Sequence, residues 1–330
     1  MNARIAARTV RTLLLTRSQV ETLVNSSLLV DRLRDGFVAY SATSSNRARR
    51  VRSAFPNSAG SATVLFPGTA PGVPAYTVKV HAKFPNESPA IRGVLCLHDL
   101  ATGGLLAVMD STFLTAIRTG IAGALAAHVL ARPEAEPAAI IGAGVQGTFQ
   151  LRALANMRPL KRVWVYDIVA ERAEAFAQAM GKELSLPIEV APSVSSAVGQ
   201  AAIVLAATWS KAPLILPGML APGTHVTTLG PDEPGKAEVA ASLVQEGLFV
   251  CDDRDLAVEL GAVGGVGLGP EVVDAELGEV LSGRHPGRTS SSQITIYGGV
   301  GLAFQDTVTA WQAYESARSR GIGSEIDFLG

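Results

Sequence analysis

The chain has 330 residues, a formal net charge of −1 at pH 7, 48% hydrophobic residues and 17% charged residues. This length and composition indicate a globular protein with enough sequence for one large or two ordinary domains, and they exclude a disordered chain. The near-neutral charge gives no general attraction to nucleic acid or to an anionic membrane surface, so we expect neither as a partner.

The N-terminal third predicts short strands separated by turns. Residues 12–15 predict a first strand, and residues 17–25 predict a helix that opens with a T-x-x-Q capping box at Thr16 and Gln19. Three further strands are expected, over residues 62–66, 75–82 and 93–98. We expect Pro67-Gly68 to end the first of these, because this pair is typical of a turn.

A long helix is predicted next, over residues 111–131. Its apolar side chains recur at the spacing of one helix face, and Ser111 stands at the position of an N-cap. The Arg132-Pro133 pair ends the helix, because the residue before a proline disfavours helical backbone. No apolar run in the chain approaches the length of about 18 residues that suggests a membrane span, so none is expected.

Strands and helices alternate after residue 137. Apolar strands are expected over residues 138–141, 162–166, 202–207, 225–229 and 248–251. Helices are expected over residues 146–157, 172–180 and, at the end of the chain, 300–319. Continuous Val, Ile and Leu runs between helices are typical of a parallel sheet that is buried on both faces. The predicted fold class is therefore α/β, with a Rossmann-type doubly wound parallel sheet.

A glycine-rich loop, Gly142-Ala143-Gly144-Val145-Gln146-Gly147, follows the strand at 138–141 and opens the next helix. In such a G-x-G-x-x-G pattern the first glycine permits a tight turn and the second lets the backbone approach a pyrophosphate. The third lets the helix pack against its strand. Phosphates then meet backbone N–H groups at the positive end of the helix dipole. We expect the loop to bind a dinucleotide through Gly142, Gly144, Val145, Gln146 and Gly147.

An acidic residue, Asp167, follows the second predicted strand and stands about 20 residues after the loop, where an acid bonds the ribose hydroxyls of NAD. The next residues, Ile168 and Val169, bring no cation that would compensate a 2′-phosphate. NAD(H) is therefore the expected cofactor, and NADP(H) is disfavoured. Arg172 leaves the second alternative open, because its side chain can reach back toward a phosphate.

The sequence resembles the ornithine cyclodeaminase/mu-crystallin family over nearly its full length. The matching runs are Val51-Arg52-Ser53, Val78-Lys79-Val80, LLAVMDSTFLTAIRTG at 105–120, the loop at 142–147, GPDEPGKAE at 230–238 and GVGLAFQDTV at 299–308. The combination of TAIRT with a following G-A-G-x-Q loop is specific to this family, and ordinary Rossmann dehydrogenases lack it.

The resemblance implies two domains. Residues 1–118 with 303–330 would form an α/β domain that binds substrate and forms a homodimer, and residues 119–302 would form the Rossmann domain that binds NAD. The resemblance also implies action on α-amino or α-imino acids, as in ketimine and pyrroline-carboxylate reductases, alanine-type dehydrogenases and ornithine cyclodeaminases. Mu-crystallins show that a family member can instead serve as a binding protein.

Three cations are assigned by the resemblance to the substrate carboxylate: Arg52, Lys79 and Arg118. The carboxylate must be desolvated and held while hydride is transferred at Cα, and an arginine does this through two parallel hydrogen bonds. Several neighbouring arginines leave the register of Arg52 open. Thr119, directly after Arg118, is assigned to the cofactor site.

The segment GPDEPGKAE follows the strand at 225–229, at the carboxyl end of a parallel strand, where α/β sheets place their ligands. The resemblance assigns its Asp232 to the substrate amine and the proton of that amine, and counts Lys79 with it as catalytic. One departure concerns Val64. Cyclodeaminases carry a glutamate at this position, so the valine removes an acceptor for the δ-ammonium of ornithine and favours a less basic substrate.

The remaining residues predict no other chemistry. Cys96 and Cys251 lie far apart without a Cys/His cluster, so no metal site is expected and a reducing, cytoplasmic location is favoured. Of the five histidines, His81 shares a strand face with Lys79 and can line the substrate site. We predict an NAD(H)-dependent oxidoreductase of small α-amino or α-imino acids. The alternatives are an ornithine cyclodeaminase that forms proline and ammonia, and a non-catalytic mu-crystallin-like binding protein.

Overall fold

The computed structural model describes residues 11–43, 47, 50–54, 62–84, 87 and 89–328, and the chain divides into two compact units. The first unit contains residues 1–29, 45–115 and 303–330, and the second contains residues 30–44 and 116–302. The functional domains at 1–118 with 303–330 and at 119–302 stay a prediction. The compact units change slightly earlier in the long helix, and the second also takes residues 30–44.

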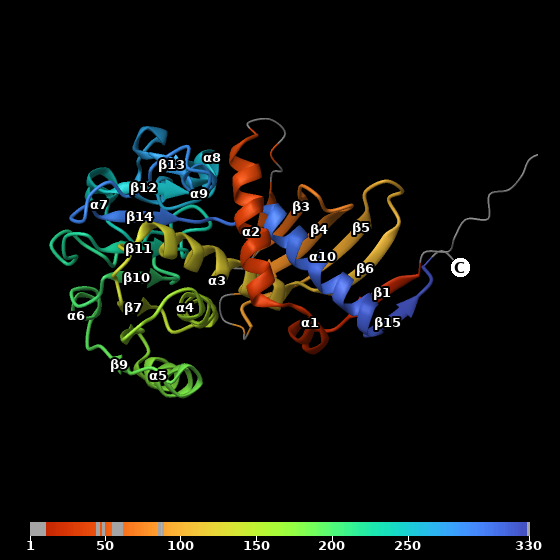
Figure 1. The fold of residues 1–330 in the computed structure, drawn as a ribbon, viewed down its shortest axis with the longest axis horizontal. Coiled ribbons are helices and arrows are strands. Elements are labelled where there is room, and N and C mark those ends of the chain that lie inside the picture. Colours follow the sequence, from red (N-terminus) through yellow and green to blue (C-terminus); the bar gives the residue numbers. More distant parts are fainter. Residues whose placement is uncertain are drawn as a thin grey trace, which may run out of the picture. The chain divides into compact units, whose positions relative to one another are not determined.

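The first unit is built on a seven-stranded sheet in the order β15-β1-β6-β5-β4-β3-β2 (Figure 1). Its strands are β1 (Thr12–Leu15), β2 (Val51–Ala54), β3 (Ala62–Thr69), β4 (Ala75–Lys83), β5 (Ile91–Asp99), β6 (Leu105–Asp110) and β15 (Ser324–Ile326). β1 and β6 run parallel, whereas the other neighbours run antiparallel. Helices α1 (Arg17–Leu23) and α10 (Ala303–Arg320) supply the hydrophobic side chains that pack on one face of this sheet.

The four strands predicted for this unit are present as β1, β3, β4 and β5, but β2, β6 and β15 were not predicted, and the predicted end of β3 was wrong. Pro67-Gly68 does not end β3, which continues to Thr69 and pairs with β4 along its whole length. The paired part of β2 ends opposite Leu65, so Pro67 lies on an edge segment, where a missing N–H is tolerated. Gly68 is required there because a Cβ would lie 2.7 Å from the Cβ of Ala303, at the start of α10.

Two predictions about helices also differ from the structure: one helix was missed, and the N-cap of another was misplaced. The sequence did not predict α2 (Ser26–Ser41), although Leu29, Leu33 and Phe37 recur at helical spacing and are fully buried. Its cap is Asn25, whose Oδ1 accepts a hydrogen bond from the Leu28 backbone N–H at 3.0 Å. The cap of the long helix α3 (Ser111–Leu130) is Asp110 and not Ser111, because the Phe113 N–H donates to Asp110 Oδ1 at 3.0 Å.

The second unit contains an eight-stranded sheet in which every neighbouring pair runs parallel. Its order is β13-β12-β14-β11-β10-β7-β8-β9 (Figure 1). The strands are β7 (Pro137–Ile141), β8 (Arg162–Tyr166), β9 (Ile188–Val190), β10 (Ile203–Ala206), β11 (His225–Thr228), β12 (Leu248–Cys251), β13 (Ala275–Glu276) and β14 (Thr295–Gly298). From β7, the chain winds first toward β9 and then returns to β10 and β11. This is the Rossmann arrangement, and its switch point lies between β7 and β10.

Both faces of the second sheet are covered, as predicted. The α-helices of this unit, besides most of α2 and α3, are α4 (Val145–Met157), α5 (Ala170–Leu184), α6 (Val194–Val198), α7 (Ala241–Glu246), α8 (Arg254–Glu259) and α9 (Leu277–Leu281). Thr227 of β11 faces α3 and donates to the Gly123 carbonyl at 3.3 Å. The preceding residue, Val226, faces the other side, where it joins a core that includes Ala197 of α6 and Leu243 of α7. Alternate residues of one strand therefore pack against different helix layers.

Helix α3 also corrects the expectation that no segment has the length and hydropathy of a membrane span. Among the described helices, it alone is long and apolar enough to cross a membrane, with a mean hydropathy of 1.5. However, 72% of that window is buried inside the protein. This burial is what a core helix needs, since a helix that is apolar on most sides must be covered by other elements.

Candidate active site

The glycine-rich loop connects β7 to α4 at the switch point of the second sheet. Gly142 has a φ of +103°, and a Cβ at this position would lie 2.6 Å from the Ala207 carbonyl oxygen. At Gly147 a Cβ would overlap the Gly142 carbonyl oxygen, so the helix can start this close to its strand only without a side chain. Gly144, the N-cap of α4, faces open space instead. The loop thus combines a tight turn, close packing and an uncovered backbone.

These features fit a bound dinucleotide. An α-helix leaves its first four N–H groups without partners inside the helix, and α4 has 13 residues over which its peptide dipoles align. Val145, in the first turn, is 57% exposed. Gln146 Oε1 is buried and accepts no hydrogen bond from the described residues, which suits an acceptor that faces a ligand donor. The predicted loop residues therefore surround a place where phosphates can approach the backbone.

Asp167 follows β8 and folds back onto the loop. Its Oδ2 accepts a hydrogen bond from the Ala143 N–H at 2.9 Å, and its Oδ1 accepts one from the Val169 N–H at 3.0 Å. Each carboxylate oxygen has two lone pairs, so both retain capacity for ribose hydroxyls. Ile168, next in the chain, is 89% exposed. The carboxylate is therefore held beside the loop by the backbone on both sides of it.

The first unit brings Arg52, Lys79 and His81 to one face of its sheet. Across β2, β3 and β4, Arg52 lies opposite Val64, and Val64 lies opposite His81. Two residues further along β3, Phe66 lies opposite Lys79 of β4. Val64 and Phe66 are buried, so these rows point toward the covered face. Arg52 itself is exposed, whereas Lys79 is fully buried.

Lys79 forms a buried ion pair that the sequence analysis did not predict. Its Nζ donates to Oδ2 of Asp306, on α10, at 2.6 Å, and both side chains are almost completely buried. Thr115 Oγ1 lies 3.5 Å from the same ammonium. The pairing satisfies the charge of Lys79 and aims its ammonium at a fixed place. Asp306 lies in the matching run GVGLAFQDTV, but nothing in its local pattern separates it from an ordinary acid in the first turn of a helix.

Two cationic side chains lie near the Phe66 ring, on the same face of the first sheet. Lys79 Nζ lies 5.4 Å and Arg50 Cζ lies 4.7 Å from its centroid, both within reach of a cation–π contact. Burial and the nearby Lys79 ammonium lower the pKa of His81 to about 3, so this imidazole is neutral at pH 7. Arg50 therefore joins Arg52 as a candidate cation at this face.

Arg118 lies in the part of α3 that belongs to the second unit, and it is 5% exposed. Its guanidinium rests against Gly301: a Cβ on that glycine would lie 3.2 Å from Arg118 Cζ and still closer to Nη1. Thr119 is half-buried. The predicted clamp residues are thus divided between the units, with Arg52 and Lys79 in the first and Arg118 in the second.

Asp232 lies in the loop after β11, and its carboxylate is not isolated. Lys236 Nζ donates to Asp232 Oδ1 at 2.9 Å and lies 2.9 Å from Glu233 Oε1. The ammonium also lies 4.0 Å from the centroid of the Trp209 ring. Burial acts to lower the pKa of Lys236, but the two carboxylates outweigh it and raise that pKa. Lys236 therefore stays charged and gives the Asp232 carboxylate a fixed cationic partner.

A second carboxylate, Glu238, is buried under this loop and bonds to its backbone. It is 1% exposed, and it accepts hydrogen bonds from the Thr208 N–H, from Thr228 Oγ1 at 2.6 Å and from the Gly230 N–H at 3.0 Å. Burial raises the pKa of Glu238, while these donors oppose the shift. Glu238 thereby ties the ends of β10 and β11 to the loop that carries Asp232. Both Lys236 and Glu238 stand in GPDEPGKAE, where the i,i+4 spacing of Asp232 and Lys236 was an available signal.

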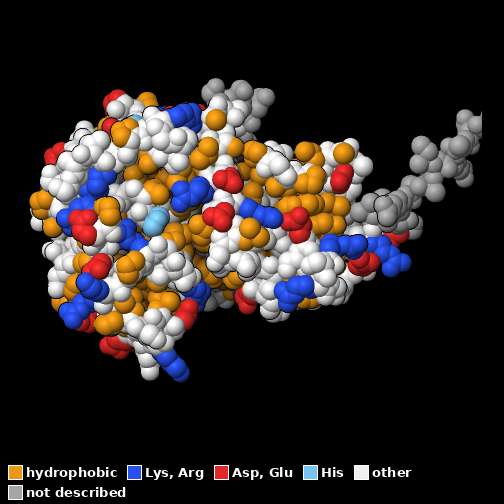
Figure 2. All heavy atoms as spheres, viewed as in Figure 1, with side chains coloured by type: hydrophobic (Ala, Val, Ile, Leu, Met, Phe, Trp, Pro, Cys, Tyr) orange, Lys and Arg blue, Asp and Glu red, His pale blue; other side chains and the backbone are white. Residues whose placement is uncertain are grey.

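The remaining histidines and acidic groups bear on whether the protein can hold a metal ion. Among the described residues, no group of three or more His, Cys, Asp or Glu side chains could hold a metal ion. His225 is fully buried between the Thr295 and Thr227 hydroxyls, at 2.9 and 3.0 Å, and burial lowers its pKa to about 3. His225 is therefore a neutral structural residue. On the face shown in Figure 2, basic and acidic side chains are interspersed over the described surface.

The chain is similar over nearly its full length to one protein family and to several dehydrogenases and reductases. A family model described as ornithine cyclodeaminase/mu-crystallin family matches residues 10–321. The alanine dehydrogenase of Archaeoglobus fulgidus is 31% identical, over 96% of this chain and 99% of that protein. An archaeal alanine dehydrogenase dimer with bound NAD superimposes with a TM-score of 0.90 at 30% identity, over 97% of this chain and 100% of that one. A Thermococcus litoralis Δ1-pyrroline-2-carboxylate reductase, in complex with NADH and L-proline, superimposes with a TM-score of 0.88 at 30% identity, over 96% and 100%.

Proposed function

The chain belongs to the ornithine cyclodeaminase/mu-crystallin family, and we propose that it is an NAD(H)-dependent oxidoreductase of small α-amino and α-imino acids. The observation that carries this function is a full-length likeness to enzymes bound to NAD, and to NADH with L-proline, together with a loop whose glycines fit a dinucleotide. Within this activity, we assign an imino acid without a second amine as the preferred substrate.

The cofactor is held by residues of the second unit. The backbone from Gly142 to Gly147 takes the pyrophosphate, and Asp167 takes the ribose hydroxyls. When bound, the nicotinamide supplies or accepts the hydride at the substrate Cα. Val145, Gln146 and Thr119 complete the assigned cofactor contacts. Ile168 and Val169, both exposed, bring no charge directly after Asp167, which favours NADH over NADPH.

Arg52, Lys79 and Arg118 are assigned to the substrate carboxylate. Arginine offers two parallel donors, and the Lys79 ammonium has further donors beyond the one given to Asp306. Holding the substrate carboxylate orients the substrate Cα for hydride transfer and keeps water away from the carboxylate charge. His81, neutral and on the same sheet face as Lys79, adds no competing charge there.

Asp232 is assigned to the nitrogen of the substrate. Oxidation of an amine requires its neutral form, and reduction of an imine requires a proton at nitrogen, so a carboxylate placed there has a role in either direction. The Lys236 ammonium donates to Asp232 Oδ1 and so fixes the carboxylate that is assigned to this proton. We count Lys236 as a positioning residue for Asp232 in this scheme.

Val64 supports the assignment of a substrate without a second amine. It is 4% exposed and lies on the covered sheet face, in the row that also holds Arg52 and His81. An apolar side chain at this place offers no acceptor for a side-chain ammonium, whose desolvation would stay uncompensated. This disfavours ornithine, and with it the cyclodeaminase alternative.

The assignment predicts the outcome of a substrate screen. NADH oxidation should be fastest with Δ1-pyrroline-2-carboxylate or another ketimine acid, or with pyruvate plus ammonia, and ornithine with NAD⁺ should give little turnover. kcat/KM should be higher with NADH than with NADPH. NADH oxidation at 340 nm checks the reductions with both cofactors. Assays of proline and ammonia check ornithine, because its cyclodeamination regenerates NAD⁺ and leaves no net change at 340 nm.

Three results of that screen would contradict the proposal. Rapid formation of proline from ornithine would show that the protein is an ornithine cyclodeaminase. A higher kcat/KM with NADPH would remove Asp167 as the selector of the cofactor. Conversion of none of these acids, with NADH still bound, would favour the non-catalytic binding protein.

The uncovered face of the first sheet supports a homodimer. Val51, Leu65, Val80 and Val94 lie in register across four strands, and each is between 38% and 60% exposed. An in-register row of exposed aliphatic side chains marks an interaction surface. We assign a second copy of this chain as its occupant, because one of the compared structures is a dimer.

The dimer can be tested at the centre of this row. Val80→Glu should give a monomer by light scattering at micromolar concentration, because a carboxylate would have to be buried in an apolar interface. The matched control is Val190→Glu, on β9 of the second unit, which is 43% exposed and should leave the mass of the wild type unchanged. A monomeric wild-type protein would refute the assignment.

The thiols support a reducing location for the protein. Cys96 and Cys251 are both free in the structure, and burial raises the pKa of each thiol. Free, protonated cysteines suit a reducing compartment, so we assign the protein to the cytoplasm.

A further inference from the structure

In the second unit, the Arg118 guanidinium packs against backbone that a buried carboxylate holds in place. We call Asp252, Val300 and Gly301 together the Arg118 seat. Its guanidinium lies against the backbone of Gly301, which has a φ of +94°, a region that side chains other than glycine rarely adopt. Any side chain at this position would also occupy the space of the guanidinium. Gly301 is therefore required twice, once for its backbone angle and once for the room that it leaves.

The seat is held by one buried carboxylate. Asp252, 1% exposed, accepts through Oδ2 the backbone N–H groups of Val300 at 2.9 Å and of Gly301 at 2.5 Å. These two bonds fix the peptide that contacts the guanidinium. The phenol of Tyr297 is buried beside them: burial and the Asp252 carboxylate hold the pKa of Tyr297 well above its usual range, while the Arg118 guanidinium lowers it. One tyrosine thus lies within the electrostatic reach of both groups.

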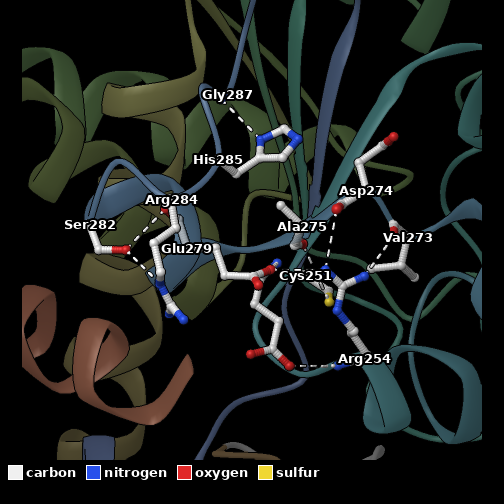
Figure 3. Close-up of polar contacts among 11 residues, drawn as sticks. Cys251, Arg254, Val273, Asp274, Ala275, Glu279, Ser282, Arg284, His285 and Gly287 are labelled. Atoms are coloured by element: carbon white, nitrogen blue, oxygen red, sulfur yellow. Dashed lines mark hydrogen bonds and ion pairs between the residues drawn. The ribbon is translucent and has the colours of Figure 1, made fainter. Parts of the chain in front are cut away.

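Asp252 is itself fixed from both sides along the chain. Before it, Cys251 is buried at the end of β12. After it, Asp253 caps α8 through the Leu256 N–H at 2.8 Å and accepts the Tyr40 hydroxyl at 2.6 Å. Figure 3 shows the next residue, Arg254, reaching the Val273 carbonyl at 2.7 Å and the Glu279 carboxylate at 2.9 Å. The turn that carries Asp252 is therefore fastened to the neighbouring strand and helix.

We propose that Asp252 and Gly301 act as positioning residues for Arg118, holding its guanidinium in the orientation that receives the substrate carboxylate. The inference rests on the proposed function, which gives Arg118 that role. It adds a device that the sequence pattern did not indicate: a carboxylate that orients the arginine through two backbone N–H groups and a glycine. Because a misplacement of about 1 Å can cost about 10²-fold in rate, the seat carries a measurable part of catalysis.

Gly301→Ala tests the seat, because the added methyl displaces the guanidinium. We expect kcat/KM to fall by about 10²-fold, mainly through KM, with the Kd for NADH unchanged. The matched control is Gly267→Ala, also in the second unit, where φ is +75° and an added Cβ meets no atom within 4 Å. This control carries similar backbone strain without displacing Arg118, so it should keep the wild-type kcat/KM.

Three further variants test the seat through Asp252 and through Arg118. Asp252→Ala removes the acceptor and should lower kcat/KM as Gly301→Ala does, whereas Asp252→Asn keeps an oxygen for the two N–H groups and should recover most of the activity. In an Arg118→Ala background, Gly301→Ala should cause no additional loss, because residues that act as one unit are not additive.

The outcomes separate this inference from the proposed function. Wild-type kcat/KM in folded Gly301→Ala, an equal loss in Gly267→Ala, or a further loss in the Arg118→Ala background would each overturn the seat. Where Gly301→Ala does not fold, equal activity of Asp252→Ala and Asp252→Asn overturns it. If Arg118→Ala alone keeps wild-type activity, the carboxylate assignment fails instead.

Discussion

Arg118→Ala is expected to lower kcat/KM for the best substrate by roughly two to four decades, with little change in the Kd for NADH. The side chain is 5% exposed, so its charge is largely out of water. Removing one partner of a buried charged pair costs about 3–5 kcal/mol, which corresponds to this loss. The cofactor keeps its own contacts, because Gly142 to Gly147 and Asp167 are assigned to it.

The measurements are steady-state kinetics and titration of NADH fluorescence on the same preparations. Arg118→Lys should recover only part of the activity, because an ammonium cannot reproduce the two parallel hydrogen bonds of a guanidinium. The matched control is Arg152→Ala on α4, which removes an arginine from an exposed pair with Glu183 and should leave kcat/KM unchanged. Full activity of Arg118→Ala would reduce Arg118 to a structural residue of α3.

Asp306→Ala is expected to destabilise the protein by about 3–5 kcal/mol, the second large effect, because it leaves the Lys79 ammonium buried without its acceptor. The pair has a separation of 2.6 Å, and its side chains are 0% and 1% exposed. Denaturant unfolding measures the loss as a lower midpoint. The control is Glu183→Ala, which breaks the exposed Arg152 pair, with side chains 36% and 43% exposed, and should cost less than about 1 kcal/mol.

A double replacement separates the structural and catalytic roles of this pair. Lys79→Met with Asp306→Leu removes both charges and keeps similar volumes, which is often neutral or stabilising for a buried pair. We expect stability to return toward that of the wild type while turnover remains lost, because Lys79 is assigned to the substrate carboxylate. Turnover in the double variant would refute that assignment. A stable Asp306→Ala would show instead that the pair contributes little to the fold.

The fold of the second unit could be predicted because its signals are local. The alternation of strand and helix, the glycine loop and Asp167 all fall within one βαβ segment, where each residue acts on close chain neighbours. The structure then shows Gly142 with a positive φ and Asp167 bonded to the Ala143 N–H. The missed helix α2 was also visible locally, in the spacing of Leu29, Leu33 and Phe37.

The partners of the charged residues could not be predicted in the same way. Lys79 and Asp306 are 227 positions apart, and the bond between Asp252 and Gly301 spans 49. No period or motif relates such residues. Each could equally have been a solvated surface charge, and only the packing of α10 on β4, or of β14 beside β12, removes water from them.

The sequence by itself thus determined the fold class, the glycine-rich turn and the family, because periodicity, glycine spacing and turn chemistry act over a few residues. Only the tertiary structure decided which charges are buried together: Asp306 beside Lys79, Lys236 beside Asp232, and Asp252 below the peptide that supports Arg118. The physical reason is that the energy of a charge depends on its solvent exposure and its neighbours in space, and both are set by contacts between distant segments.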